Sequence, residues 1–135
     1  MNISDLSIGN VYTNNEIMDA FECAFMGGMR RSKKTNTLVL VFDHTKRLYD
    51  DCWDGNVLHY TGMGKTGDQV LKGNQNKTLY ESDTNGVHVH LFEVFHEGRY
   101  TYQGEVKLAG KPYKSIQKDE NYNDREVWIF PLIRK

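Results

Sequence analysis

The stretch YDDCWDGNVLHYTGMGKTGDQVLKGNQNKTL, residues 49–79, decides how this chain is organised. It gathers two tyrosines, several acids, a cluster of amides and five glycines, and strand-like sequences lie on both sides of it. Binding residues usually lie in irregular polar segments that a rigid β scaffold holds in place. We therefore expect the functional site in this segment.

The two tyrosines of the segment, Tyr49 and Tyr60, suggest the shape of the site. Asp50 and Asp51 directly follow Tyr49. If the flanking strands bring the two rings face to face, the gap between them is a flat slot with a carboxylate at its edge. Such a slot suits a planar ring that carries hydrogen-bond donors, such as an amino-bearing base. Alternatively, the tyrosines are half-buried barrel residues, and the acids cap a turn or face solvent.

Length and composition are those of one ordinary domain, which we assign to residues 1–135. With a net charge of −1 the chain is not a globally basic nucleic-acid protein, so any such role requires a local patch. The longest apolar run, LVLVF at residues 38–42, is far too short to span a membrane. Without a signal peptide, the default expectation is a cytoplasmic protein with Cys23 and Cys52 as reduced thiols.

Before the central segment, the sequence predicts one helix and one buried strand. The polar residues 13–16 offer a helix cap, and the apolar run at residues 38–42 is typical of a buried strand. Gly27-Gly28 is expected to end the helix. Its apolar residues follow at helical spacing: Ile17, Ala20, Phe21 and Ala24.

From the central segment onward, short strands dominate. We expect strand pieces at residues 48–49 and 57–60, a helical turn at 79–82, a hairpin turn at 83–86, strands at 87–95 and 99–108, a polar, mobile stretch at 118–125 and a last buried strand at 127–132. This pattern predicts an α+β fold that is mainly β: a curved sheet or small barrel with one or two short helices. The domain could be one part of a longer protein.

Six fragments in order give the chain a specific resemblance. It resembles the SRA domain (also called the YDG domain), most closely the bacterial form fused to HNH restriction endonucleases or attached to helicases. The fragments are Ile8-Gly9 with Gly27-Gly28-Met29-Arg30; Leu38-Val39-Leu40; Tyr49-Asp50-Asp51, Asp54-Gly55-Asn56 and Tyr60-Thr61-Gly62-Met63-Gly64; residues 68–71 with 74–79; residues 99–104; and residues 127–132. In the fifth, Gln103 stands where the signature Tyr-Asp-Gly has its aspartate.

The resemblance implies a PUA-like fold that flips a modified cytosine, 5-methylcytosine or 5-hydroxymethylcytosine, out of duplex DNA. By this likeness, Tyr49 and Tyr60 stack on the base. Asp51, or else Asp50, accepts a hydrogen bond from the N4 amine. Thr61 and Gly62 line the space around the 5-substituent.

Two groups of residues are expected to contact the DNA duplex: a wedge that the resemblance implies, and local basic and amide side chains. Lys65-Thr66-Gly67 is much shorter than the family's finger loop, so Phe25 or Met26 is expected to wedge into the duplex instead. The candidate phosphate contacts are Arg30, Arg31, Lys33, Lys34, Lys65, Asn74, Asn76 and Lys77. The basic residues could instead form a solvated loop, and the asparagines could form turns.

The function expected from these observations is a non-catalytic reader without cofactor or metal, whose partner is double-stranded DNA containing modified cytosine. A fused or associated nuclease or helicase would supply any reaction in a bacterial restriction system. A PUA-like domain that binds RNA or a free modified nucleotide is the alternative, and a hydrolase built on Asp50 and Asp51 lacks a visible base partner. His88 and His90 form an H-x-H pair that we interpret as two solvent-side histidines rather than a metal site.

Overall fold

The apolar run that the sequence marks as a buried strand lies at the centre of the fold. The computed structural model describes residues 1–46 and 49–135, and in it this run forms β3 (Thr37–Asp43). β3 pairs in parallel with β6 (His88–His96), although Thr37 and its partner His88 are about 50 residues apart in sequence. Every other strand pair described is antiparallel. The central segment therefore lies within the connection between two paired strands.

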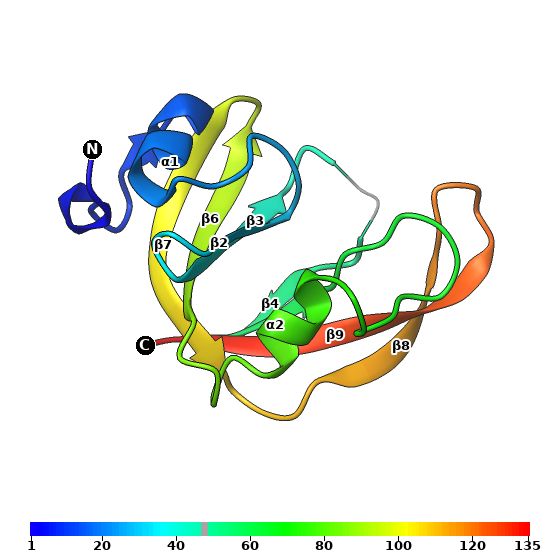
Figure 1. Cartoon of the computed structure of the whole chain (residues 1–135). Helices are drawn as coiled ribbons and strands as arrows, with labels where there is room; N and C mark the ends of the chain where they lie inside the picture. The colour runs from blue at the N-terminus through cyan, green and yellow to red at the C-terminus, as the bar shows by residue number, and fades with distance from the viewer. Residues whose placement is uncertain (47–48) are drawn as a thin grey trace.

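The whole sheet is curved and mixed, with nine strands in the order β2-β3-β6-β7-β9-β5-β4, while β1 pairs with β7 and β8 pairs with β9 (Figure 1). The remaining strands are β1 (Val11–Tyr12), β2 (Met29–Ser32), β4 (Cys52–Asp54), β5 (Val57–Thr61), β7 (Arg99–Leu108), β8 (Tyr113–Lys118) and β9 (Asp124–Arg134). This arrangement confirms the predicted mainly β, PUA-like fold with a curved sheet.

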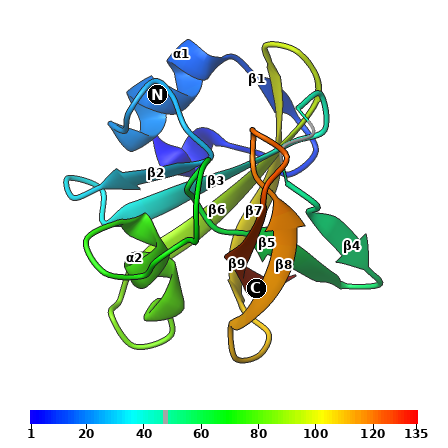
Figure 2. The same cartoon turned by 90° about the vertical axis from the view of Figure 1, so that its right-hand side faces the viewer.

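Two short helices accompany the sheet (Figure 2). α1 (Asn14–Phe21) begins at the predicted place: the Thr13 hydroxyl accepts from the Glu16 N–H, and the Glu16 carboxylate accepts from the Thr13 N–H. It ends at Phe21, where Glu22 adopts a left-handed conformation, so the prediction that it runs to Gly27 is wrong.

α2 (Gln75–Tyr80) begins earlier than the predicted helical turn at residues 79–82. The Asn74 side chain accepts from the backbone N–H of Asn76 and caps this helix at its start. A single-turn 3₁₀ helix, η1 (Ile3–Asp5), precedes β1.

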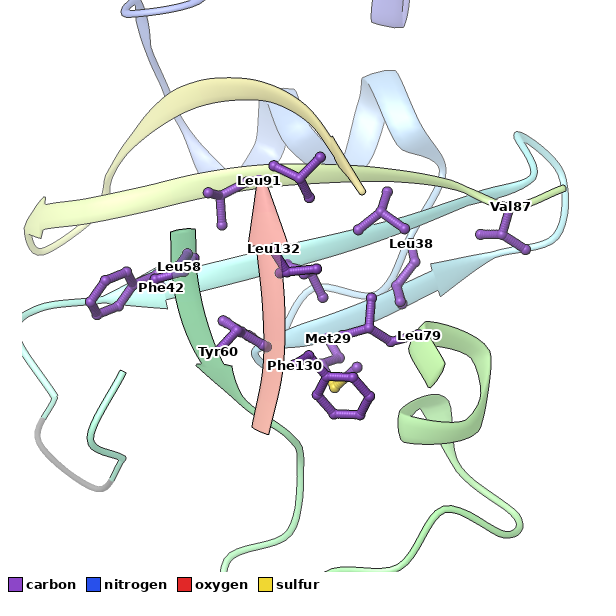
Figure 3. Packing of buried hydrophobic residues seen from close by; sticks show 13 residues of the cluster. Met29, Leu38, Phe42, Leu58, Tyr60, Leu79, Val87, Leu91, Phe130 and Leu132 are labelled. Atoms are coloured by element: carbon purple, nitrogen blue, oxygen red, sulfur yellow. The ribbon is translucent and has the colours of Figure 1, made fainter. Parts of the chain in front are cut away.

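The core consists of two apolar clusters on opposite faces of the sheet. Alternate residues of β3 enter different clusters, because successive side chains of a strand point to opposite faces. On one face, α1 packs Ile17 and Phe21 against Phe92, and the Phe21 and Phe92 rings meet edge to face at 5.9 Å. On the other, Leu79 of α2 and Tyr60 of β5 lie among the residues drawn in Figure 3.

Several local predictions differ from the structure. Residues 83–86 connect α2 to β6 rather than two strands of a hairpin, because the strand beside β6 is the distant β3. Residues 118–125 are not a free polar stretch: they contain the turn of the β8–β9 hairpin, in which Asp119 and Arg125 are buried. Of the strand piece expected at residues 48–49, Leu48 lies outside the described residues and Tyr49 is in no strand.

His90 is a further correction. It is buried and its Nδ1 lies 2.8 Å from the Tyr102 hydroxyl, whereas His88 is exposed at the start of β6. Burial lowers the pKa of His90 to about 4. Both cysteines, Cys23 and Cys52, are free thiols. Neither helix in the described part of the chain has the length and apolar character needed to cross a bilayer.

Candidate functional site

Tyr49 and Tyr60 occupy different environments. The Tyr60 ring is only 3% exposed, and its hydroxyl donates to the backbone oxygens of Gly28 at 2.6 Å and Val41 at 3.3 Å. Burial raises the pKa of Tyr60 well above its usual value. Tyr49 is half-buried, and its hydroxyl donates to Gly64 O at 3.1 Å. Tyr60 is thus a core residue, whereas Tyr49 lies near the surface.

The two neighbouring acids are equally distinct. The Asp51 carboxylate is partly buried and accepts a hydrogen bond from the Thr61 N–H at 2.6 Å, whereas the Asp50 side chain is exposed. Burial raises the pKa of Asp51 to about 6, although the bond from Thr61 acts in the opposite direction. Asp51 is therefore a carboxylate beside β5 whose protonation changes near neutral pH.

Gln117, which the sequence reasoning missed, joins this cluster from β8. Its amide nitrogen donates to the Thr61 hydroxyl at 3.1 Å, and its amide oxygen accepts from the Asp50 N–H at 3.3 Å. β8 gave no clear strand signal, because Gln117 is the one residue of that strand that is buried. Gln117 therefore links the backbone of Asp50 to Thr61 of β5.

Gly62 and the residues after it form a loop that two buried amides hold in place, one of which, Gln69, also bonds to β9. Gln69 donates to Gly62 O at 2.7 Å and accepts from Trp128 N at 3.0 Å. The Asn76 side chain is fully buried, accepts from Met63 N at 2.8 Å and donates to Met63 O at 3.0 Å. These bonds fix the course of the main chain next to Asp51.

Gly62 is required for this arrangement by close packing. A Cβ atom added there would lie 2.6 Å from the Asn76 side-chain oxygen, a distance that real Cβ contacts do not reach. The predicted place of Gly62 beside a 5-substituent stays a prediction, since its immediate neighbours are Asn76 and Gln69.

Arg125 lies beneath the same loop and was not predicted. It is 3% exposed, its Nη1 donates to the carbonyl oxygens of Gly64 and Gly67, and its guanidinium carbon lies 5.9 Å from the centre of the Tyr49 ring. The available signal was an arginine between two acids, Asp124 and Glu126, directly before the apolar part of the last strand. Its contacts depend on the folding of a loop about 60 residues earlier.

The predicted wedge residues are on the surface. Phe25 and Met26 are 55% and 75% exposed in the connection from α1 to β2. They directly precede Gly27-Gly28, and Gly28 O accepts the hydrogen bond from Tyr60. An exposed apolar tip therefore lies near the inner wall of the site in sequence and in structure.

The predicted phosphate contacts fall into two groups. Three of them are engaged inside the protein: Arg30 is buried and bonds to Asn14 and Gly27 O, Arg31 bonds to the carbonyl oxygens of Ser32 and Thr37, and Asn76 holds the loop described above. The structure shows that these three make bonds within the protein, and their part as phosphate contacts stays a prediction. Asn74 is partly buried as the cap of α2. The exposed members are Lys33, Lys34, Lys65 and Lys77.

A separate network involves Trp53, the middle residue of β4. The Glu93 carboxylate is buried, lies 2.7 Å from His44 Nε2 and accepts from the Trp53 indole N–H at 3.2 Å. These groups border a cavity of about 570 Å³ lined by Trp53, Gly55, Asn56, Glu93, Ile133 and Arg134. A second cavity, of about 440 Å³, lies between α2 and the turn before β8. Neither cavity includes Tyr49, Asp51 or Tyr60.

No cluster of three or more metal-ligating side chains occurs within residues 1–46 and 49–135. The donors around Asp51 are backbone N–H groups, amides and hydroxyls. Such a set can hold and read a polar planar ligand by hydrogen bonding.

Comparison with known proteins identifies the family of the chain and its fold. The family model described as "ScoMcrA-like, SRA domain" matches residues 8–134. No curated protein matches the sequence. At 18% identity, the fold is similar to that of the sulfur-binding and SRA domains of ScoMcrA complexed with phosphorothioated DNA (TM-score 0.77, covering 96% of this chain and 40% of that chain).

Two other solved structures share the fold. The modification-dependent TagI restriction endonuclease is 20% identical, with a TM-score of 0.73 over 99% of this chain and 51% of that one. The SUVH5 SRA domain in complex with methylated CHH DNA is 21% identical, with a TM-score of 0.71 over 96% of this chain and 89% of that one. The chain spans 40% and 28% of the two ScoMcrA chains to which it is similar.

Proposed function

Because the chain belongs to the family of ScoMcrA-like SRA domains, we propose that it is a reader of modified DNA that binds 5-methylcytosine or 5-hydroxymethylcytosine by base flipping. The observation that carries the proposal is the position of Asp51, a partly buried carboxylate held by Thr61 N beside the half-buried ring of Tyr49. Solved SRA structures of this fold contain methylated, hydroxymethylated or phosphorothioated DNA.

The chemistry of base choice follows from Asp51. An ionised carboxylate accepts a hydrogen bond from the N4 amine of cytosine but repels O4 of thymine. Extruding a base costs a few kcal/mol, and stacking on an aromatic ring returns about 1–3 kcal/mol per base. A modified cytosine is thus held by one charge-assisted hydrogen bond and by stacking.

The two tyrosines have different parts in this proposal. Tyr60 is held in the core by its bonds to Gly28 and Val41, so it supplies a fixed wall. Tyr49 is attached to the loop through Gly64 O and is partly exposed, so it is the ring that turns to admit the base. Thr61 and Gly62, between Asp51 and the loop, are the proposed neighbours of the 5-substituent.

Duplex contacts come from the exposed groups around this site. Phe25 and Met26 are the apolar side chains that would fill the space left by the base. Lys33, Lys65 and Lys77 are exposed and supply local positive charge in a chain whose net charge is −1. In this proposal the domain directs a nuclease or helicase, fused or associated, to marked DNA and has no catalytic role itself.

One observation favours a second candidate, a free modified nucleotide. Gln69 and Asn76 tie the loop after Gly62 back onto the protein, so it does not project as a finger into a duplex. A free nucleotide leaves no hole in a duplex to be filled. The alternative shares Tyr49 and Asp51 with the first proposal and differs in its need for duplex DNA.

The test is binding to matched duplexes that carry one cytosine, 5-methylcytosine or 5-hydroxymethylcytosine next to 2-aminopurine. We expect tighter binding to a modified duplex and a rise in fluorescence as the base leaves the stack. Asp51→Asn should abolish the preference, whereas Asp50→Asn, at the exposed neighbouring acid, should retain it. Binding that ignores the modification would reject the proposal, and binding of the free nucleotide without the duplex would favour the alternative.

A further inference from the structure

Arg125 is a buried cation with incomplete hydrogen bonding. Its Nη1 is bonded to two backbone oxygens, but its Nε and Nη2 are buried and have no hydrogen-bond partner among the described residues. Within residues 1–46 and 49–135 no carboxylate lies in ion-pair distance of it; Asp119 uses its Oδ1 to accept from the N–H groups of Asn121 and Asn123. Buried guanidinium N–H groups without an acceptor are unfavourable, so the Nε and Nη2 edge of Arg125 favours an anionic ligand with two oxygens.

The two unpartnered nitrogens are the ones that bind an anion together. The N–H bonds of Nε and Nη2 run parallel along one edge of the guanidinium plane, and this fork matches two oxygens of a carboxylate or phosphate. Nη1, the nitrogen outside this fork, is the one that holds the loop at Gly64 and Gly67. The protein therefore anchors Arg125 through one nitrogen and leaves the bidentate edge unoccupied.

Tyr49 lies next to this guanidinium. The guanidinium lies 5.9 Å from the centre of the Tyr49 ring, and the Tyr49 hydroxyl shares the Gly64 carbonyl with Arg125 Nη1. A rotation of Tyr49 that admits a base would change the packing around the guanidinium at the same time. Base insertion and anion binding would then be linked through this ring.

We propose that Arg125 binds, through Nε and Nη2, the two non-bridging oxygens of a phosphodiester next to the flipped nucleotide. The inference rests on the proposed function, because the flipped nucleotide brings its phosphates to this position. A phosphate matches both the fork and the charge. The carbonyl oxygen of a base would match the donors but leave the positive charge uncompensated.

The experiment removes the charge of one phosphate at a time. Modified duplexes carry a neutral methylphosphonate at either phosphate flanking the modified cytosine or, as a control, several nucleotides away. Affinities are measured for the wild-type protein, for Arg125→Lys, which keeps a positive donor for the loop but lacks the fork, and for Arg99→Lys, the same change at an exposed position.

For the wild type, we expect one flanking methylphosphonate to weaken binding about 10- to 100-fold, the range for hydrogen bonds to a charged group. Arg125→Lys should weaken binding of the ordinary modified duplex to a similar degree and should lose sensitivity to that methylphosphonate. Arg99→Lys should behave as the wild type. Thermal unfolding of each variant shows that the fold is retained.

Two results would overturn the inference while the proposed function stands: a wild type that prefers the modified duplex but is insensitive to both flanking methylphosphonates, or an Arg125→Lys variant that keeps the wild-type sensitivity. If Arg125→Lys loses only the discrimination against thymine, the group that Arg125 binds is on the base rather than on a phosphate, and the inference is also overturned. If the wild type shows no preference for modified DNA, the proposed function fails and the inference fails with it. The methylphosphonate series on the wild type decides the matter even if a variant does not fold.

Discussion

The carboxylate of Asp51 accepts a 2.6 Å hydrogen bond from the backbone N–H of Thr61. Asp51 directly precedes β4, and Thr61 is the last residue of β5. Burial raises the pKa of this carboxyl from 3.8 to about 6 in the folded protein. The folded chain therefore retains the proton between about pH 4 and 6, where the unfolded chain has lost it. The contribution of Asp51 to the free energy of unfolding is therefore most favourable at low pH, falls as the pH rises toward 6 and is constant above that.

Because the pKa of Asp51 is raised, we predict that Asp51→Asn stabilises the protein at pH 7.5, since a neutral amide avoids the burial of charge. The expected gain in the free energy of unfolding is about 1 kcal/mol after allowance for solvent screening. The gain should shrink as the pH falls to 4.5. Urea unfolding of both proteins at the two pH values measures it. A gain that grows toward acid pH would contradict the assignment, and Asp50→Asn at the exposed acid serves as the control.

DNA binding should have its own dependence on pH. If the ionised Asp51 accepts from the cytosine amine, affinity for the modified duplex should fall as the pH is lowered through about 6, where the carboxyl gains its proton. Titration of binding from pH 8 to 5 at constant ionic strength measures this. This dependence of affinity on pH should vanish in Asp51→Asn. If the variant keeps it, another titrating group is responsible.

Gly62→Ala should destabilise the loop strongly. The added Cβ would meet the Asn76 oxygen at 2.6 Å and would displace the amide that pairs with Met63 N and O. Leaving such buried groups unpaired costs about 1–3 kcal/mol each. Chemical denaturation checks the loss. Gly110→Ala, whose Cβ would meet its nearest neighbour at 3.8 Å, should be close to neutral.

The hydroxyl groups of the two tyrosines should differ in their effect on stability. Tyr60→Phe removes a buried donor from Gly28 O and Val41 O and should cost about 1–2 kcal/mol of unfolding free energy. Tyr49→Phe removes one bond near the surface and should cost less than about 0.5 kcal/mol. If the two variants lose equal stability, Tyr60 is not the fixed wall proposed above.

Glu93→Ala should loosen the attachment of β4. It removes the acceptor of the Trp53 indole and the partner of His44, which should cost about 2 kcal/mol. The emission of Trp53 should shift to longer wavelength as the indole N–H meets water, while Trp128 on β9, whose ring contacts Tyr80 and Lys114, reports the background. Unchanged emission would show that Glu93 does not hold Trp53.

The elements that could be predicted from the sequence have strong local patterns. β3 is a continuous apolar run, and β7 was found with its observed boundaries between two turn signals. β8 was missed because it is an edge strand whose side chains are mostly exposed, so it lacks apolar alternation. The turn at residues 83–86 was misassigned because local sequence does not reveal that β6 pairs with β3.

At the site, the order of the motifs located Tyr49, Asp51 and Tyr60 but not their burial. That Asp51 turns inward and Asp50 outward depends on Thr61 and Gln117, which come from two other strands. Arg125 reaches the site only through a loop closed by Gln69 and Asn76. Contacts made across such distances in sequence cannot be inferred from the pattern of any one element.

The parallel pairing of β3 with β6 has a consequence for folding and for variation in length. The central segment of the site, residues 49–79, lies in the connection that this pair closes, so it can be ordered only after two segments about 50 residues apart have met. The entropy of closing such a connection grows slowly, by about 0.6 kcal/mol for each doubling of its length. The connection can therefore gain or lose several residues at little cost to the stability of the sheet. It is the part of the chain in which ligand preference can change while the scaffold stays the same.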